Sequence, residues 1–307
     1  MSEQTLQGIA SHLRETSIAA AWRQWAALGA VVDADPAARS IVDPEALLLI
    51  SLCFGAYERR FHDLVTSWSK QWIRLVSVQR IKNLMPLFSR STAQAVGEFA
   101  GYAVGEAKDH RWRSLAEPGA DFLGESRGKK WQPLAGFTSD AALMLRLRQG
   151  FGVNLRADLL AFLLSRRAGK ATVAELATVG YTKAAVRRTA DEMAAARFIL
   201  KMPDAPSDYY EIDREGWLRL LGILPDLPTW DYWQLLFGMA SRIDEWAATA
   251  ADRSVTAMAR DILGQDLIAS DWAQLARLQP FLRSRPGDTV SFDRQVELLC
   301  DRIGQRV

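Results

Sequence analysis

Cysteine, histidine and long apolar runs are all scarce in this sequence of 307 residues. The two cysteines, Cys53 and Cys300, are far apart in the chain, which excludes a disulfide framework and makes a reducing cytoplasm the expected compartment. The three histidines are also far apart, so we expect no His/Cys metal site and no cofactor. No stretch reaches the roughly 20 apolar residues of a membrane span, and the N-terminus lacks the apolar segment of a signal peptide.

Sequence motifs typical of enzymes are absent as well. The chain has no G-x-G-x-x-G or Walker phosphate loop, no H-E-x-x-H zinc motif, no G-x-S-x-G turn and no C-x-x-C pair. The adjacent acids Asp191-Glu192 and Asp244-Glu245 point to different sides of a helix, which is poor geometry for a catalytic pair of carboxylates. We therefore do not expect an enzyme.

The composition that remains is that of a folded globular protein, with 49% hydrophobic residues, 24% charged residues and eleven tryptophans that favour burial. The net charge of +2 is unevenly distributed. Residues 64–212 hold 22 basic and 14 acidic side chains, a net charge of +8, whereas residues 1–63 and 213–307 carry −3 each. A basic middle favours a polyanionic partner, although an uneven solvated surface explains the same pattern.

Helical periodicity dominates the chain, so we expect a mostly α-helical protein. The predicted parts are a helical N-terminal domain (1–116), a linker rich in glycine and proline (117–140), a domain with the only strand candidates (141–222) and a helical C-terminal region (223–307). The expected helices are 5–29, 44–54, 61–73, 77–88, 90–108, 155–165, 172–179, 182–198, 230–246, 254–263, 271–278 and 292–303.

The expected helix 90–108 carries a glycine series, Gly97, Gly101 and Gly105, at intervals of four residues. On a helix these glycines form a flat groove that another backbone can approach closely. We expect a close helix crossing there, either within the chain or between two copies of it.

Residues 155–212 give the most informative pattern. An apolar helix precedes a short one, which Thr172 caps and Glu175 completes as a capping box. Gly180 then allows a tight turn, Thr182 caps a further helix, and two strand candidates flank the loop PDAPSD near residues 198–212. The order is that of a helix-turn-helix followed by a hairpin.

This order resembles a winged helix-turn-helix domain, similar in pattern to the bacterial ArsR/MarR-type regulators. The resemblance covers about 60 of the 307 residues and is carried by ATVAELATVGYTKAAVRRTADEMAAARFI, in which a short helix, Gly-Tyr-Thr, a longer helix and a strand follow one another. It implies a multi-helical fold with a small β-hairpin wing, and a longer helix that reads duplex DNA.

The helix after Thr182 has an apolar side, formed by Val186, Ala190 and Met193, and an opposite side that is small and basic. Arginine contacts phosphates or the edge of guanine, and a helix N-terminus favours a phosphate. The candidate DNA contacts, with Lys201 added from the first strand candidate, are Thr182, Lys183, Ala184, Arg187, Arg188 and Lys201. The alternative is an exposed helix on which Asp191 pairs with Arg187.

A second, weaker candidate lies at residues 44–88, where three helices lead to a polar face with Gln79, Lys82 and Asn83 outward and Arg80 beside them. Glutamine suits adenine and arginine suits guanine, so Gln79, Arg80 and Lys82 are also candidate DNA contacts. No strand pair follows, so this would be a helix-turn-helix without a wing. An ordinary helical bundle with a basic face is the alternative.

The sequence therefore predicts a cytoplasmic bacterial protein that binds double-stranded DNA and regulates transcription. Helix-turn-helix proteins usually bind two half-sites as two-fold dimers, so we expect a homodimer. Its contact would come from apolar helices outside residues 155–212, either the glycine-bearing helix or the tryptophan-bearing C-terminal helices. The alternative is a winged-helix module for protein–protein contact, such as an antitoxin or assembly factor, whose binding would depend much less on salt.

Overall fold

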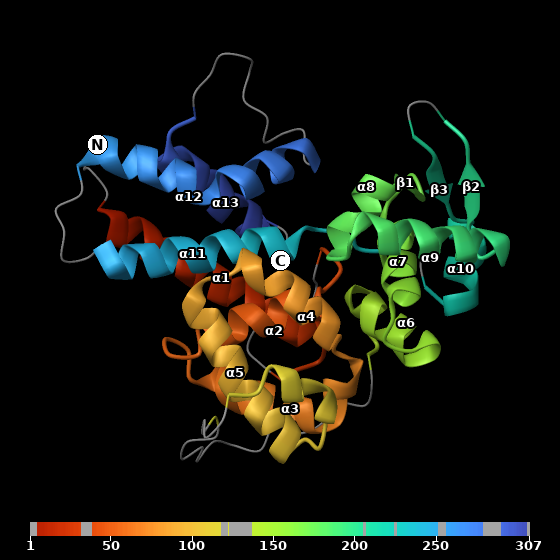
Figure 1. Cartoon of the computed structure of the whole chain (residues 1–307), viewed down its shortest axis with the longest axis horizontal. Coiled ribbons are helices and arrows are strands. Elements are labelled where there is room, and N and C mark those ends of the chain that lie inside the picture. Colours follow the sequence, from red (N-terminus) through yellow and green to blue (C-terminus); the bar gives the residue numbers. More distant parts are fainter. Residues whose placement is uncertain are drawn as a thin grey trace.

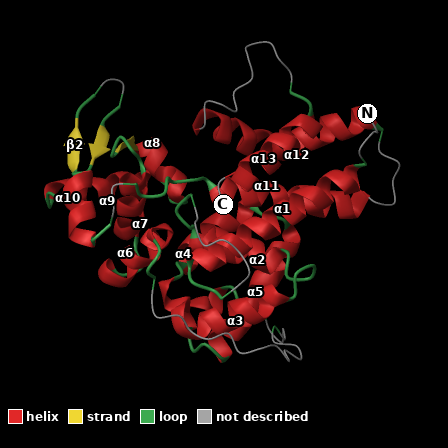
Figure 2. Cartoon of the chain, turned by 180° about the vertical axis from the view of Figure 1, so that it is seen from behind, coloured by secondary structure: helices red, strands yellow, loops and turns green. Residues whose placement is uncertain are grey.

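A computed structural model of the chain describes residues 5–31, 39–117, 122, 137–204, 207–223, 226–250, 256–278 and 290–305. These residues form thirteen α-helices, several short 3-10 helices and one three-stranded sheet. They are arranged as a helical body and a smaller part that holds the sheet at one end (Figures 1 and 2). The predicted mostly α-helical fold with a small amount of strand is confirmed. Within the described ranges, every helix is too short or too polar to cross a membrane.

The helical body is built around the buried helix α2. Its helices are α1 (Leu6–Ala27), α2 (Pro44–Cys53), α3 (Arg60–Trp72), α4 (Val78–Leu84), α5 (Arg90–Gly105), α11 (Trp233–Ala250), α12 (Ala257–Leu278) and α13 (Phe292–Gln305). Residues 44–52 are all buried because apolar side chains occupy every side of α2, against which α1, α3, α4, α5 and α11 pack. α2 begins at Pro44, as the predicted range 44–54 has it, and the Asp43 carboxylate caps it by accepting a hydrogen bond from the Ala46 amide at 3.0 Å.

The part with the sheet, which we call the sheet unit, comprises residues 140–223. Its elements are η4 (Asp140–Ala142), α6 (Leu143–Phe151), α7 (Leu155–Ser165), β1 (Lys170–Thr172), α8 (Val173–Leu176), η5 (Ala177–Val179), α9 (Lys183–Ala195), β2 (Leu200–Met202), β3 (Tyr209–Glu211) and α10 (Arg214–Leu221). The strands are antiparallel in the order β1-β3-β2, and Tyr210 of β3 lies opposite both Ala171 and Lys201. The three helices and the hairpin predicted for residues 155–212 are confirmed.

The structure differs from the sequence prediction at four elements. The helices predicted at 254–263 and 271–278 are one continuous helix, α12, in which Gly264 does not end the helix but lets the Phe292 ring pack closely. α6 and α10 are not predicted, because they are only nine and eight residues long. β1 is not predicted either, because it forms only by pairing with β3, which lies about 40 residues later in the chain.

The predicted linker lies mostly outside the described residues, and two glycines of the predicted series lie where no described helix crosses closely. Of the linker 117–140, residues 118–121 and 123–136 lie outside the described ranges, whereas Phe122 is buried and stacks on His62 at 4.0 Å between ring centroids. A Cβ added to Gly97 would meet the Glu117 side chain at 3.2 Å, and one on Gly105 would meet nothing within 4 Å. At these two glycines, therefore, no described helix makes the expected close crossing.

A different glycine does mark a close crossing, and its replacement should be destabilising. A Cβ on the buried Gly238 of α11 would lie 2.7 Å from the Leu87 carbonyl oxygen, so the backbone of one of the two segments must shift. We expect Gly238→Ala to lower the free energy of unfolding by about 1–3 kcal/mol, the usual range for overpacking. Gly105→Ala is the matched control and should raise it by up to about 1 kcal/mol, because helical glycine is less favourable than alanine. Chemical denaturation of both variants measures the difference; equal midpoints would contradict the close contact.

Candidate nucleic-acid interface

A tight turn between α8 and α9 begins the candidate site. The Thr172 side chain and Glu175 form the predicted capping box at the start of α8. Gly180 has φ +104°, a left-handed conformation that side-chain-bearing residues rarely adopt, so glycine fits this turn. The Thr182 hydroxyl then accepts a hydrogen bond from the Ala185 amide at 3.3 Å and starts α9. The sequence therefore predicts this local structure correctly.

The two sides of α9 are also distributed as predicted. Val186, Ala190 and Met193 are buried, whereas the candidate DNA contacts Thr182, Lys183, Ala184, Arg187 and Arg188 are all exposed. Among the described residues, Arg187 and Arg188 have no ion-pair partner. This side of α9 consequently presents two exposed guanidinium groups.

Asp191 makes no direct ion pair with Arg187, the predicted alternative, although the Arg187 charge contributes to the lowered pKa of Asp191. Its carboxylate instead accepts hydrogen bonds from the Lys201 ammonium at 2.9 Å and from the Tyr210 hydroxyl at 2.7 Å. These two hydrogen bonds hold the pKa of Asp191 below its usual value, while hydrogen bonds to Asp191 and Asp208 raise the pKa of Lys201. The charge of Lys201 is thus balanced within the chain, which argues against Lys201 as a DNA contact.

The second candidate surface lies beside the first. On α4, Gln79, Lys82 and Asn83 are exposed as predicted. The Gln79 amide donates to the Asn83 side chain at 3.0 Å, and the Asn83 amide donates to the carbonyl oxygen of Gly180 at 2.9 Å. The outer face of α4 therefore adjoins the turn that precedes α9, so the structure brings together two surfaces that the sequence predicts separately.

Arg80 is a correction to the predicted set, because it is completely buried and cannot contact DNA. Its guanidinium group forms ion pairs with Asp43 and Glu45 at the start of α2, and its Nε donates to the Val179 carbonyl oxygen. These partners lie more than 30 residues away in sequence, so the helical pattern of residues 77–88 alone does not reveal them.

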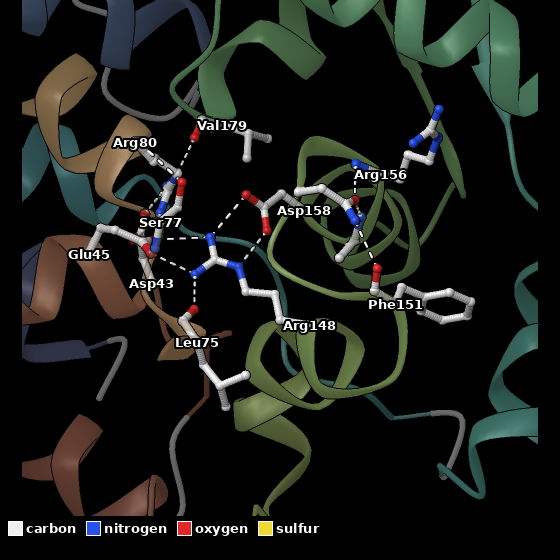
Figure 3. A network of polar contacts seen from close by, with 12 residues as sticks. Asp43, Glu45, Leu75, Ser77, Arg80, Arg148, Phe151, Arg156, Asp158 and Val179 are labelled. Atoms are coloured by element: carbon white, nitrogen blue, oxygen red, sulfur yellow. Dashed lines mark hydrogen bonds and ion pairs between the residues drawn. The ribbon is translucent and has the colours of Figure 1, made fainter. Parts of the chain in front are cut away.

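Arg80 belongs to a buried polar network between the helical body and the sheet unit (Figure 3). Arg148 of α6 pairs with Glu45 at 2.6 Å and with Asp158 of α7 at 2.7 Å, and it donates to the Leu75 carbonyl oxygen at 2.9 Å. The Tyr181 hydroxyl donates to Asp158 at 2.9 Å. Burial alone would raise the pKa of Glu45, but Arg148 and Arg80 outweigh it and hold that pKa below its usual value. The Glu45 carboxylate therefore remains ionised within the network.

Three consecutive carbonyl groups of the turn accept hydrogen bonds from side chains of the helical body. Gln234 of α11 donates to the oxygen of Thr178 at 2.6 Å, Arg80 donates to that of Val179, and Asn83 donates to that of Gly180. These are the carbonyls that the end of η5 leaves without partners inside the helix. The helical body consequently fixes the turn, and with it the N-terminus of α9.

The network residues Glu45, Arg148 and Asp158 are not predicted from the sequence. A signal was nonetheless present, because each is a charged residue within an apolar run, in PEALLLIS, LMLRLRQ and LRADLLAFLL. Fully buried charges are rare unless they are paired, so such residues indicate distant partners. Within the described ranges, no three His, Cys, Asp or Glu side chains gather in a way that could hold a metal ion.

Comparison of the chain with protein-family models, with curated proteins and with solved structures gave no match. The functional assignment therefore depends on the residues and geometry of this chain.

Replacing Arg148 should destabilise the protein, because Arg148 joins the sheet unit to the helical body through the buried network. Removing one partner from a buried ion network leaves uncompensated charge, which costs about 3–5 kcal/mol. We expect Arg148→Met to lower the free energy of unfolding by that amount. Arg294→Met, which breaks an exposed pair with Glu297 on α13, should change it by about 0–1 kcal/mol. Urea denaturation compares the two; a loss for Arg148→Met no greater than that for the control would show that the network does not join the two parts.

Proposed function

We propose that this chain is a winged helix-turn-helix protein that binds double-stranded DNA and regulates transcription in the cytoplasm. One observation carries the proposal: Arg187 and Arg188 are exposed on α9, directly after a glycine turn, without ion-pair partners among the described residues. An arginine that is not engaged within the chain can contact a phosphate or the O6 and N7 atoms of guanine. The hairpin of β2 and β3 would be the wing.

The N-terminal half of α9 has the properties of a helix that enters a major groove. Ala184 is small and exposed, so the backbone can approach the bases closely. Lys183 is exposed at the helix start, where free backbone N–H groups and the helix dipole favour a phosphate. Arg187 and Arg188 follow one turn later and can extend contact along the groove.

The outer face of α4 would enlarge this surface. Gln79 and Lys82 are exposed on the helix that holds Gly180 through Asn83, so a duplex seated on the start of α9 would pass near them. We assign them a supporting role, chiefly with the phosphate backbone. Arg80 and Lys201 are excluded from the contact set, because carboxylates of the chain already balance their charges.

The double variant Arg187→Ala/Arg188→Ala tests the proposed role of α9. Both side chains are exposed, so its stability should change by no more than about 0.5 kcal/mol, while affinity for DNA should fall at least about tenfold. Each lost phosphate contact should also lower the slope of log K against log salt concentration by about 0.9. Fluorescence anisotropy with labelled genomic fragments at two salt concentrations measures both quantities.

The matched control is Arg113→Ala/Arg294→Ala, which removes the same charge from η3 (His110–Ser114) and α13. It should bind as the wild type does. If the control weakens binding as much as the α9 variant, the effect is one of net charge only. If the wild type binds no fragment at low salt, DNA binding is excluded and the protein-interaction alternative replaces it.

The contribution of α4 is tested by Lys82→Ala against Lys70→Ala, an exposed lysine on α3. We expect Lys82→Ala to weaken binding to all DNA sequences to a similar extent. It should also reduce the slope of log K against log salt concentration by about one unit, as loss of a single phosphate contact does. Lys70→Ala should leave both unchanged. Wild-type binding by Lys82→Ala would restrict the DNA surface to α9.

A further inference from the structure

An exposed apolar surface lies at the outer end of the sheet unit, on residues other than the proposed DNA contacts of α4 and α9, and it includes β2 of the proposed wing. Six side chains form it, from the end of α6, from β2 with the residues before it and from α10: Phe151, Phe198, Leu200, Met202, Trp217 and Leu220. Leu220 is 74% exposed and Leu200 is 56% exposed. Both views place β2 and α10 at the end of the molecule that is farthest from the body (Figures 1 and 2). We call this set of six residues the outer patch.

Five of the six residues of the outer patch, all except Met202, form a continuous and hollowed surface. The Trp217 ring lies 6.0 Å from those of both Phe151 and Phe198, measured between centroids. A hollow of about 300 Å³ opens beside Phe198, Leu200, Trp217 and Leu220, and a smaller one of about 170 Å³ lies between Phe151 and Phe198. Contiguous apolar surface of this kind on a folded protein usually marks a contact with another molecule.

The outer patch also includes an edge strand. β2 pairs with β3 on one side, no described strand pairs with its other side, and all three of its residues are exposed. Natural proteins protect such edges with charges, prolines or very short strands. β2 is only three residues long, and its Lys201 is held by Asp191 and Asp208. Its free edge, on which Leu200 and Met202 are exposed, still leaves backbone groups open to pairing with another strand.

The charges around the outer patch indicate which partner fits it. Most of the charged side chains near the outer patch are paired within the chain. Arg156 pairs with Glu192 at 2.7 Å, Arg219 with Glu215 at 3.8 Å, and Lys201 with Asp191 at 2.9 Å and Asp208 at 3.3 Å. Paired charges attract neither a polyanion nor a strongly charged protein, whereas a second outer patch, whose charges are paired in the same way, meets this one without like-charge repulsion.

We propose that the outer patch binds the outer patch of a second copy of this chain, related by a two-fold axis. In such an interface each surface meets its own copy, so the protruding Leu220 of one chain can enter the hollow beside Trp217 of the other. The same axis allows the two β2 edges to run antiparallel. This proposal does not depend on DNA binding. It moves the expected dimer contact away from the C-terminal helices, where Trp230 and Trp233 are buried in the chain's own core.

The test is the oligomeric state of the whole chain without DNA. Sedimentation velocity between about 1 and 100 μM brackets the Kd of a weak specific dimer. We expect the wild type to sediment as a dimer and Leu220→Glu to raise the Kd at least about tenfold, with an unchanged circular dichroism spectrum. Leu200→Glu, in the edge strand, should give the same result independently.

Met258→Glu is the matched control, because Met258 of α12 is 75% exposed and also apolar, but lies outside the outer patch. It should remain dimeric. A monomeric wild type throughout this range overturns the proposal, even if the face binds a different protein. So does a dimer that persists in both outer-patch variants, or one that dissociates only with Met258→Glu, which would place the interface on α12.

Discussion

The ion pairs of Arg80 and Arg148 are the interaction on which the arrangement of this protein depends. Both guanidinium groups and the three carboxylates of Asp43, Glu45 and Asp158 are buried, so each charge is tolerated only with its partners in place. Glu45 alone binds both arginines, one from α4 and one from α6. Since these residues come from both parts of the chain, the network fixes the sheet unit on the helical body in one orientation.

That orientation has a consequence for the proposed function. The body holds the turn before α9 through three successive carbonyls, at residues 178, 179 and 180, and Tyr181 adds its own hydrogen bond to Asp158. The turn and the start of α9 are thus among the most constrained parts of the sheet unit. As the proposed recognition helix, α9 would lose little conformational freedom on binding because it is held in this way, which favours affinity. The same contacts keep the outer face of α4 beside it.

Local features of the structure were predictable from the sequence, and non-local ones were not. The caps at Asp43, Thr172 and Thr182, the turn at Gly180 and the two sides of α9 depend on residues a few positions apart, so their patterns could be read directly. Arg80, in contrast, looked like an exposed residue, because its partners are on α2 and in the turn. β1 and the Lys201–Asp191 pair likewise depend on contacts that only folding creates.

The basic residues of 64–212 divide into those that are paired within the chain and those that are exposed. Many of them serve the fold, since carboxylates of the chain pair with Arg80, Arg148, Arg156, Arg166 and Lys201. On the face formed by α4 and α9, the exposed basic groups that remain are Lys82, Lys183, Arg187 and Arg188. The excess charge is therefore available where the turn, the helix N-terminus and the small Ala184 also favour a duplex.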